Sequence, residues 1–178
     1  MRILTAALLA LFFIGGCSQP DLEDPASPEV TLFSPKTMRI HRVFTQVKDW
    51  TGDNVPDGIE VLVEFDDRFG DPTKAAGTFT FELYDYRPGD PEPRGFRLAP
   101  WKGSIATSRE QRSRWNRVSH TYTFQLAYPV IRRDKAYVLT AYFQPLAGER
   151  LFDRVILPAQ EGTTRVPTSK PARKPLGF

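Results

Sequence analysis

Six aspartates flank one short apolar stretch, residues 59–65, and their spacing is compatible with two chemistries. They are Asp49, Asp53 and Asp57 before the stretch, and Asp66, Asp67 and Asp71 after it. Calcium binds loops that offer several carboxylate and carbonyl oxygens. Seven residues of strand span about 23 Å, so the two groups cannot share one ion, and either loop alone is a candidate calcium site. Asp is also a common turn former and the spacing is not that of an EF-hand, so we favour the alternative that these carboxylates shape two turns.

Four arginines form the second candidate site. Arg109, Arg112, Arg114 and Arg117 lie within nine residues, inside a segment, 93–135, that holds ten basic and two acidic side chains. The preceding segment, 49–92, holds twelve acidic and three basic ones. A basic cluster can bind an anionic polymer or a lipid head group. The alternative is that the two segments neutralise each other across neighbouring strands, or that the arginines are only solvated.

Aromatic and nucleophilic residues give weaker indications. Trp50, Trp101 and Trp115 lie in or near expected loops, where they could stack against sugar rings, although core packing explains most aromatic residues. His41 and His120 are the only histidines and lack metal-ligand spacing. Ser119 precedes His120 inside an expected strand, without the glycines of a nucleophile elbow. The sequence therefore predicts no catalytic residues and a protein that is not an enzyme.

The first 17 residues have the pattern of an export signal. Arg2 is followed by twelve uncharged residues, 3–14, a run too short for a membrane-spanning helix, which needs about 20 residues. Such a run is typical of the apolar core of a secretory signal. Ile14, Gly15 and Gly16 then precede Cys17: an aliphatic residue, two small residues and the only cysteine of the chain.

This ending resembles the lipobox of bacterial lipoproteins, position for position. The resemblance covers residues 1–17 alone. It implies a signal peptide over 1–16, cleavage before Cys17, and a diacylglycerol on the Cys17 sulfur that attaches the protein to a membrane of the bacterial cell envelope. Ser18 follows the cysteine, and by the same resemblance it favours the outer membrane. The alternatives are plain secretion with a free thiol, or an uncleaved anchor.

The composition of the remaining chain fits an exported domain between two unfolded segments. Residues 17–35 follow the lipobox as an acidic, Pro-rich tether, because 18–35 contain four prolines and four acidic residues and cannot bury enough apolar surface to fold. Eighteen such residues have a root-mean-square span of roughly 23 Å and a limit of roughly 60 Å. An alternative is that residues 30–33 dock as an edge strand. Residues 161–178, with four basic residues and three prolines, read as a disordered basic tail.

Residues 36–160 show the period-two alternation of β-strands. Strands are expected over 38–47, 59–65, 77–86, 96–101, 118–128, 136–143 and 151–157, with Pro- and Gly-rich turns between them. The run 136–143 is apolar on both faces and predicts a central strand. One short helix is expected over 108–115. About seven or eight strands with little helix predict an all-β, antiparallel β-sandwich, of immunoglobulin-like, transthyretin-like or C2-like type.

We therefore expect a lipid-anchored envelope protein with a non-catalytic binding or scaffolding role. Cleavage of the signal peptide removes Arg2 and leaves 23 basic and 21 acidic side chains. This balance is too nearly neutral to indicate that the protein binds nucleic acid. Expected partners are the membrane, through the acyl chains, and an anionic polymer, a glycan or an envelope protein. No cofactor is expected, apart from calcium at the Asp turns. The alternatives are a carbohydrate- or calcium-binding accessory module and, third, an envelope hydrolase.

Overall fold

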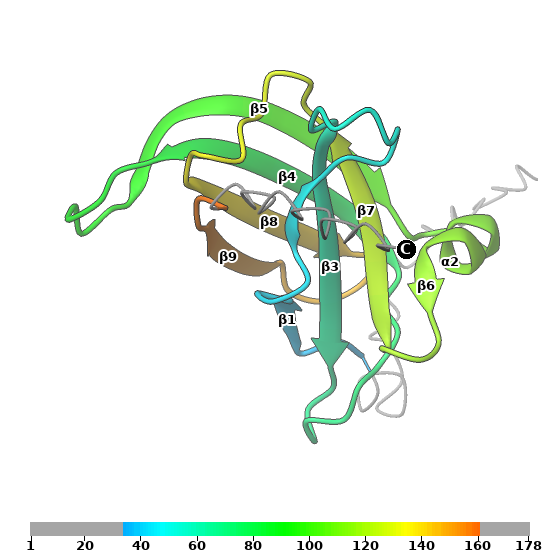
Figure 1. Cartoon of the computed structure of the whole chain (residues 1–178). Helices are drawn as coiled ribbons and strands as arrows, with labels where there is room; N and C mark the ends of the chain where they lie inside the picture. Colours follow the sequence, from blue (N-terminus) through cyan, green and yellow to red (C-terminus); the bar gives the residue numbers. More distant parts are fainter. Residues whose placement is uncertain (1–33, 161–178) are drawn as a thin grey trace, which may run out of the picture.

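The computed structural model describes residues 34–160, which form two antiparallel sheets packed face to face (Figure 1). The predicted signal peptide, Cys17, the basic tail and all but residues 34 and 35 of the tether lie outside the described residues. One sheet has the order β5-β4-β8-β9, and the other has the order β1-β3-β7-β6, with β2 also paired to β3. The predicted all-β antiparallel sandwich is confirmed.

The first sheet contains the longest strands. β4 (Gly77–Tyr86) pairs with β5 (Arg94–Ser104) on one side and with β8 (Tyr137–Pro145) on the other, and β9 (Leu151–Leu157) forms the far edge. β8 is buried on both faces along most of its length and lies between β4 and β9, so the predicted central strand is confirmed. In Figure 1 the β4–β5 hairpin extends beyond the other strands.

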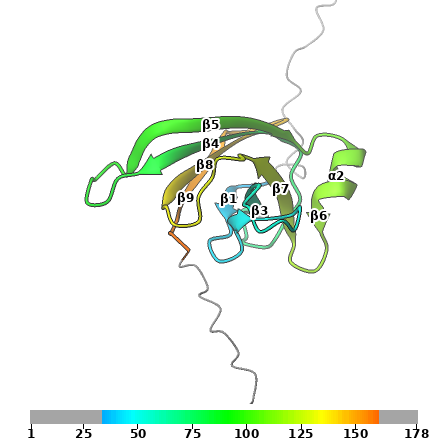
Figure 2. The same cartoon turned by 45° about the horizontal axis from the view of Figure 1, so that its top comes forward.

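The second sheet is built around β3 (Gly58–Asp66), whose side chains alternate between the core and the surface along its middle. β7 (Thr121–Ala127) pairs with one side of β3, and the two-residue β6 (Trp115–Asn116) pairs with the start of β7. β1 (Thr37–Ile40) and β2 (Gln46–Lys48) share the other side of β3. Figure 2 shows the first sheet arching over β1, β3 and β7.

Two expected strands differ in the structure, and the two-residue β6 was not predicted, because residue 115 was expected to end the helix. The expected strand 38–47 is interrupted, because residues 41–45 loop out opposite only two residues of β3, and the Thr45 hydroxyl accepts the Leu62 N–H instead (3.1 Å). β5 is longer than the expected 96–101. Its side chains are either half-buried or exposed, and none is fully buried. They therefore show no regular alternation of apolar and polar residues. Pairing with β4, whose alternation is regular, sets the length of β5.

The two flanks of the sandwich are closed differently. Between β1 and β9, the Ile40 N–H donates to the Asp153 carboxylate at 2.7 Å. Between β5 and β7, the Trp101 indole N–H donates to the Ala127 carbonyl at 3.0 Å. The helix α2 (Ser108–Arg114) follows β5 and precedes β6, and Thr107 and Glu110 cap its N-terminus reciprocally.

Aromatic rings fill the space between the sheets. Phe79 lies within 4.7–6.0 Å of four other rings, measured between centroids: Phe65, Phe81, Phe124 and Phe143. All five rings are at most 2% exposed. Because residues 34–160 contain no cysteine, this packing has to stabilise the fold without a disulfide.

Phe79→Ala tests that packing. We expect it to lower the free energy of unfolding by about 3–5 kcal/mol, because it removes buried surface and leaves a cavity among four rings. The matched control is Phe96→Ala, which removes a ring that is 75% exposed and should change stability by no more than about 0.5 kcal/mol. Urea denaturation measures both, and equal losses would contradict the role of the cluster.

Candidate functional site

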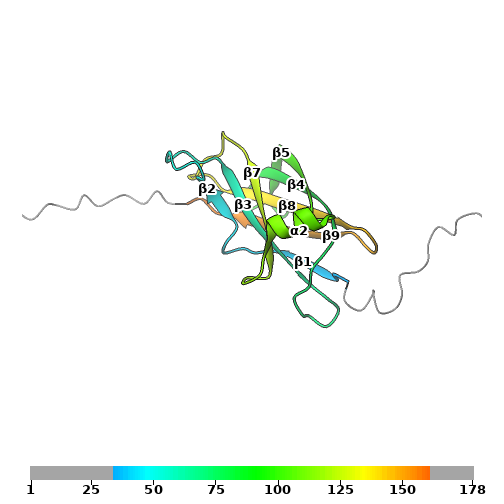
Figure 3. The same ribbon diagram turned by 90° about the vertical axis from the view of Figure 1, so that its right-hand side faces the viewer.

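One end of the sandwich gathers four segments that are distant in sequence, and we call it the basic end: residues 34–37, 67–77, 105–120 and 145–151. Backbone hydrogen bonds join them, from the Lys36 N–H to the Asp66 carbonyl (2.8 Å) and from the Leu146 N–H to the Ala76 carbonyl (3.0 Å). The Gln111 amide adds α2 to this end by donating to the Ala75 carbonyl at 2.6 Å. Figure 3 shows the start of β1 and the β8–β9 loop on one side of the molecule and the β2–β3 loop on the other.

The basic end carries more positive than negative charge. Its four segments contain four acidic side chains and eight basic ones: Lys36, Arg68, Lys74, Arg109, Arg112, Arg114, Arg117 and Arg150. The formal charge of these segments is therefore +4. Two of the acidic side chains are also engaged, because Glu110 caps α2 and Glu149 pairs with Lys36 at 3.5 Å.

The four arginines predicted as an anion site do lie at this end, but they are not equivalent. Arg114 is half-buried, and its guanidinium carbon lies 4.6 Å from the centre of the Phe124 ring, a cation–π contact that ties it to the core. Arg109, Arg112 and Arg117 are exposed. Within residues 34–160 none of these three pairs with an acidic side chain, so their charges are available to an anionic partner.

Four further cations at this end were not grouped with the arginines by sequence. Arg68, Lys74 and Arg150 come from other loops, and Lys36 comes from the approach to β1. Lys74 lies beside α2 because its ammonium sits 5.2 Å from the centre of the Trp115 ring. No local sequence pattern could have found this grouping, since strand pairing alone brings these loops together.

A buried tyrosine holds α2 and Trp115 in place. The Tyr122 hydroxyl lies 2.7 Å from the Gln111 side-chain oxygen and also accepts the Ala75 N–H at 3.3 Å. Burial raises the pKa of this phenol, which therefore stays protonated and can donate to Gln111. Its ring contacts Trp115 at 4.8 Å between centroids, and His120 stacks against Trp115 at 6.1 Å. The helix that carries Arg109 and Arg112 is thus anchored to the core.

The first Asp turn uses its carboxylates to hold its own backbone. Asp49 accepts N–H groups from Gly52 (2.6 Å) and Asn54 (2.7 Å), and these bonds lower its pKa. Asp57 accepts the N–H groups of Trp50 (2.7 Å) and Thr51 (2.9 Å). Asp53 accepts the Val55 N–H at 2.8 Å. This geometry is that of a turn stabilised by Asp side chains.

The second Asp turn is engaged in the same way. Asp67 accepts N–H groups from Phe69 (2.8 Å) and Asp71 (3.1 Å), and Asp66 pairs with Arg39 at 2.6 Å. The two turns lie at opposite ends of β3, as expected from its length. Within residues 34–160, no three His, Cys, Asp or Glu side chains are grouped so as to hold a metal ion.

The three tryptophans lie at two places along β7. Trp50 packs against Gly58, where its ring occupies the space that a side chain would need, and Trp101 binds Ala127, the residue paired with Gly58. Trp115 instead contacts the start of β7, on the far side of Phe124. The fold thus brings Trp50 and Trp101 to the same residue pair, Gly58–Ala127, and places Trp115 beside Tyr122 further along β7.

The histidines are also separated. His41 lies in the loop between β1 and β2, with its ring 4.6 Å from Phe44, and His120 lies in the turn before β7. Within the described residues neither histidine hydrogen-bonds to a carboxylate or to a serine. Their surroundings are aromatic.

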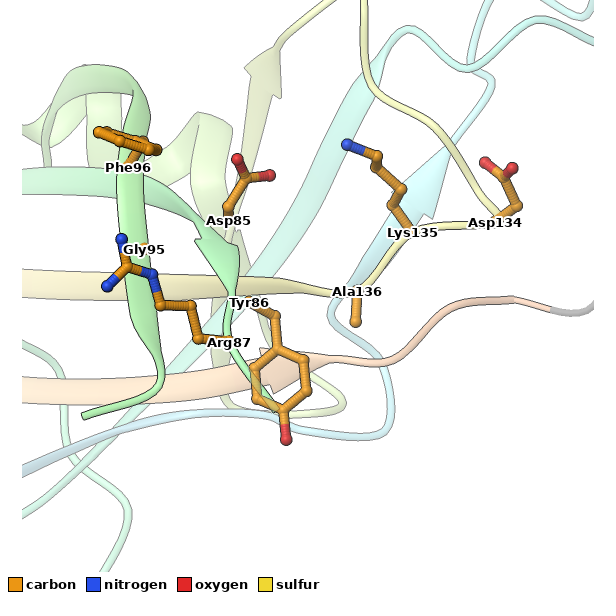
Figure 4. A pocket seen from close by; sticks show the side chains of 8 residues that line it. All are labelled: Asp85, Tyr86, Arg87, Gly95, Phe96, Asp134, Lys135 and Ala136. Atoms are coloured by element: carbon orange, nitrogen blue, oxygen red, sulfur yellow. The ribbon is translucent and has the colours of Figure 1, made fainter. Parts of the chain in front are cut away.

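Within residues 34–160, the two ends of the sandwich each carry a hollow. One, of about 480 Å³, lies at the end opposite the basic end, beside the β4–β5 hairpin. Figure 4 shows the Asp85 and Lys135 side chains extending into one side of it and the Tyr86 ring pointing the other way. The other hollow, of about 630 Å³, lies at the basic end and is lined by residues 34–36, Arg68, 147–149 and Leu151.

Comparisons of the chain with protein-family models, curated proteins and solved structures find no match. No helix within residues 34–160 has the length and apolar character needed to cross a bilayer. The site is therefore interpreted from its own geometry.

Tyr122→Phe tests the anchoring of α2. Removing the hydroxyl leaves the Ala75 N–H and Gln111 without their buried partner, so we expect a loss of about 1–3 kcal/mol in unfolding free energy. Trypsin should also cleave faster after Arg109 and Arg112, as the helix is released. The control Tyr84→Phe removes a hydroxyl that donates to Glu82 on the outer sheet face, and it should leave cleavage in α2 unchanged. Unaltered cleavage in Tyr122→Phe would contradict the anchoring role.

Calcium titration tests the Asp turns. We expect no rise in melting temperature at millimolar calcium, because an ion would have to displace the N–H groups already bound to Asp49 and Asp57. Asp49→Ala should lower the melting temperature equally with and without calcium. A calcium-dependent rise that disappears in Asp49→Ala would instead support the calcium site.

Proposed function

We propose that this chain is a lipid-anchored protein of the bacterial cell envelope whose β-sandwich has a non-catalytic binding or scaffolding role. The observation that carries the proposal is the run Ile14-Gly15-Gly16-Cys17, which resembles a lipobox. Two acyl chains on one cysteine are enough for stable anchoring, since each buried CH₂ contributes about 0.8 kcal/mol. With Ser18 after the cysteine, the proposed location is the outer membrane.

The position of the folded domain supports a tethered arrangement. The first strand of the described residues begins at Thr37, and the Pro-rich, acidic segment 18–35 lies between Cys17 and this strand in the sequence. Because the sandwich contains no cysteine, Cys17 is the sole thiol available for acylation. The role of this segment in the proposal is to hold the domain a short distance from the membrane.

A binding role is supported by the basic end. Arg109, Arg112 and Arg117 are exposed on a helix and turn that are held rigidly to the core by Gln111 and Tyr122. A rigid array of unpaired cations suits recognition of an anionic surface or polymer. The proposal includes no catalytic role; His41 and His120 lie in aromatic surroundings on different loops.

Cys17→Ala tests the anchor. In a bacterial host we expect the parent chain to fractionate with membranes and to incorporate radiolabelled palmitate. The variant should lose the label completely, because the acylated sulfur is absent. Ser18→Ala is the matched control, since it changes the neighbouring residue, keeps the thiol, and should still be labelled.

Mass spectrometry of the N-terminus completes this test. An uncleaved signal could hold Cys17→Ala on the membrane without lipid, and its mass would then include residues 1–16. A parent chain that lacks both palmitate and an acylated N-terminal cysteine would overturn the proposal, whatever its fractionation.

A further inference from the structure

We propose that the basic end of the sandwich docks on the anionic head-group surface of the membrane to which Cys17 is attached, and so orients the domain. This inference rests on the proposed lipid anchor. It adds a second membrane contact, made by the folded domain itself.

The chain enters the domain at this end. Residues 34–37 belong to the basic end and are held there by the Lys36 N–H bond to Asp66 and the Lys36–Glu149 ion pair. In the proposed lipid-anchored arrangement, residues 18–35 connect Cys17 to this end of the domain, so the entry point is the part of the domain nearest to the bilayer. The loops around residue 34 therefore meet the membrane first.

The chemistry of these loops matches a head-group layer. Arg109, Arg112 and Arg117 present guanidinium groups with no acidic partner in the described chain, and guanidinium groups bind phosphate well. Three exposed apolar side chains accompany them: Phe69 (64% exposed), Leu146 (72%) and Val118 (93%). They lie on the β3–β4, β8–β9 and β6–β7 connections respectively. Basic side chains beside exposed apolar tips suit the boundary between head groups and acyl chains.

The opposite end has the opposite charge. Its turns, residues 49–57, 87–93 and 128–136, contain six acidic and four basic side chains, a formal charge of −2. Hydrogen bonds join the first and third of these turns, since Tyr128 donates to the Asp57 carbonyl and Arg133 to the Asn54 carbonyl. The hollow lined by Arg87 and residues 134–136 places the second turn beside the third. An anionic surface attracts the basic end of the domain and repels the opposite end, so the domain is oriented with its basic end toward the membrane.

Vesicle sedimentation tests the docking without the lipid anchor. The chain used spans residues 18–160, which keeps every described residue and leaves out Cys17, the apolar run 3–14 and the four basic residues of 161–178. We expect binding to vesicles containing phosphatidylglycerol, little binding to pure phosphatidylcholine, and weakening as salt increases.

The decisive variant neutralises Arg109, Arg112 and Arg117 together, each to Gln. A basic side chain near the surface contributes roughly fivefold to membrane partitioning, so binding should fall about 100-fold. The matched control changes Arg87, Arg132 and Lys135 to Gln at the opposite end and removes the same total charge. It should bind at least as well as the parent chain, and urea midpoints confirm that both variants fold.

Equal losses in the two triple variants would overturn the proposal, because net charge rather than one end would then explain binding. So would the absence of binding to phosphatidylglycerol vesicles, or tighter binding to soluble polyglutamate than to vesicles at equal charge. These results are independent of the palmitate assay. A parent chain without palmitate whose 18–160 segment still binds the vesicles would refute the lipid anchor and leave only the head-group binding of the domain. A labelled parent chain whose 18–160 segment does not bind the vesicles would refute the docking and leave the anchor.

Discussion

Contact among five phenylalanine rings is the interaction on which the rest of this structure depends. Phe79 and Phe81 from one sheet meet Phe65 and Phe124 from the other, and Phe143 completes the group. Residues 34–160 have no disulfide to limit the unfolded state, so burial of apolar surface has to offset chain entropy. The pairing registers of β3, β4, β7 and β8 are the ones that bring these rings into contact in the core.

A sandwich held in this way sorts its loops to two ends. Each strand crosses the core once, so the loops before and after it emerge on opposite sides. This is why the two Asp turns around β3 are separated, and why loops as distant in sequence as 67–77 and 145–151 are neighbours. The charge difference between the ends is a consequence of strand direction, combined with the acidic and basic composition of particular loops.

The α2 segment joins the core to the charged surface. Contact between Gln111 and Tyr122 holds the helix against the core, and Arg114 lies over the Phe124 ring. Arg109, Arg112 and Arg117 stay exposed. One short segment thus contacts the core through Gln111 and Arg114 and also carries exposed cations of the basic end, Arg109 and Arg112. In the proposed function this coupling keeps the cations in a rigid arrangement relative to the point where the tether enters.

The sequence by itself determined the all-β class, most strand positions, the short helix and the central place of β8, because alternation and β-branched residues act locally. It also placed four arginines within nine residues, and it predicts a lipobox at Cys17, because both patterns consist of residues that are close in sequence. Tertiary structure alone decided the division of 38–47 into two strands, the length of β5, the neighbouring positions of Trp50 and Trp101 and the addition of Lys36, Arg68, Lys74 and Arg150 to the basic end. These depend on contacts between residues far apart in the chain, and such contacts arise only when the two sheets pair and pack.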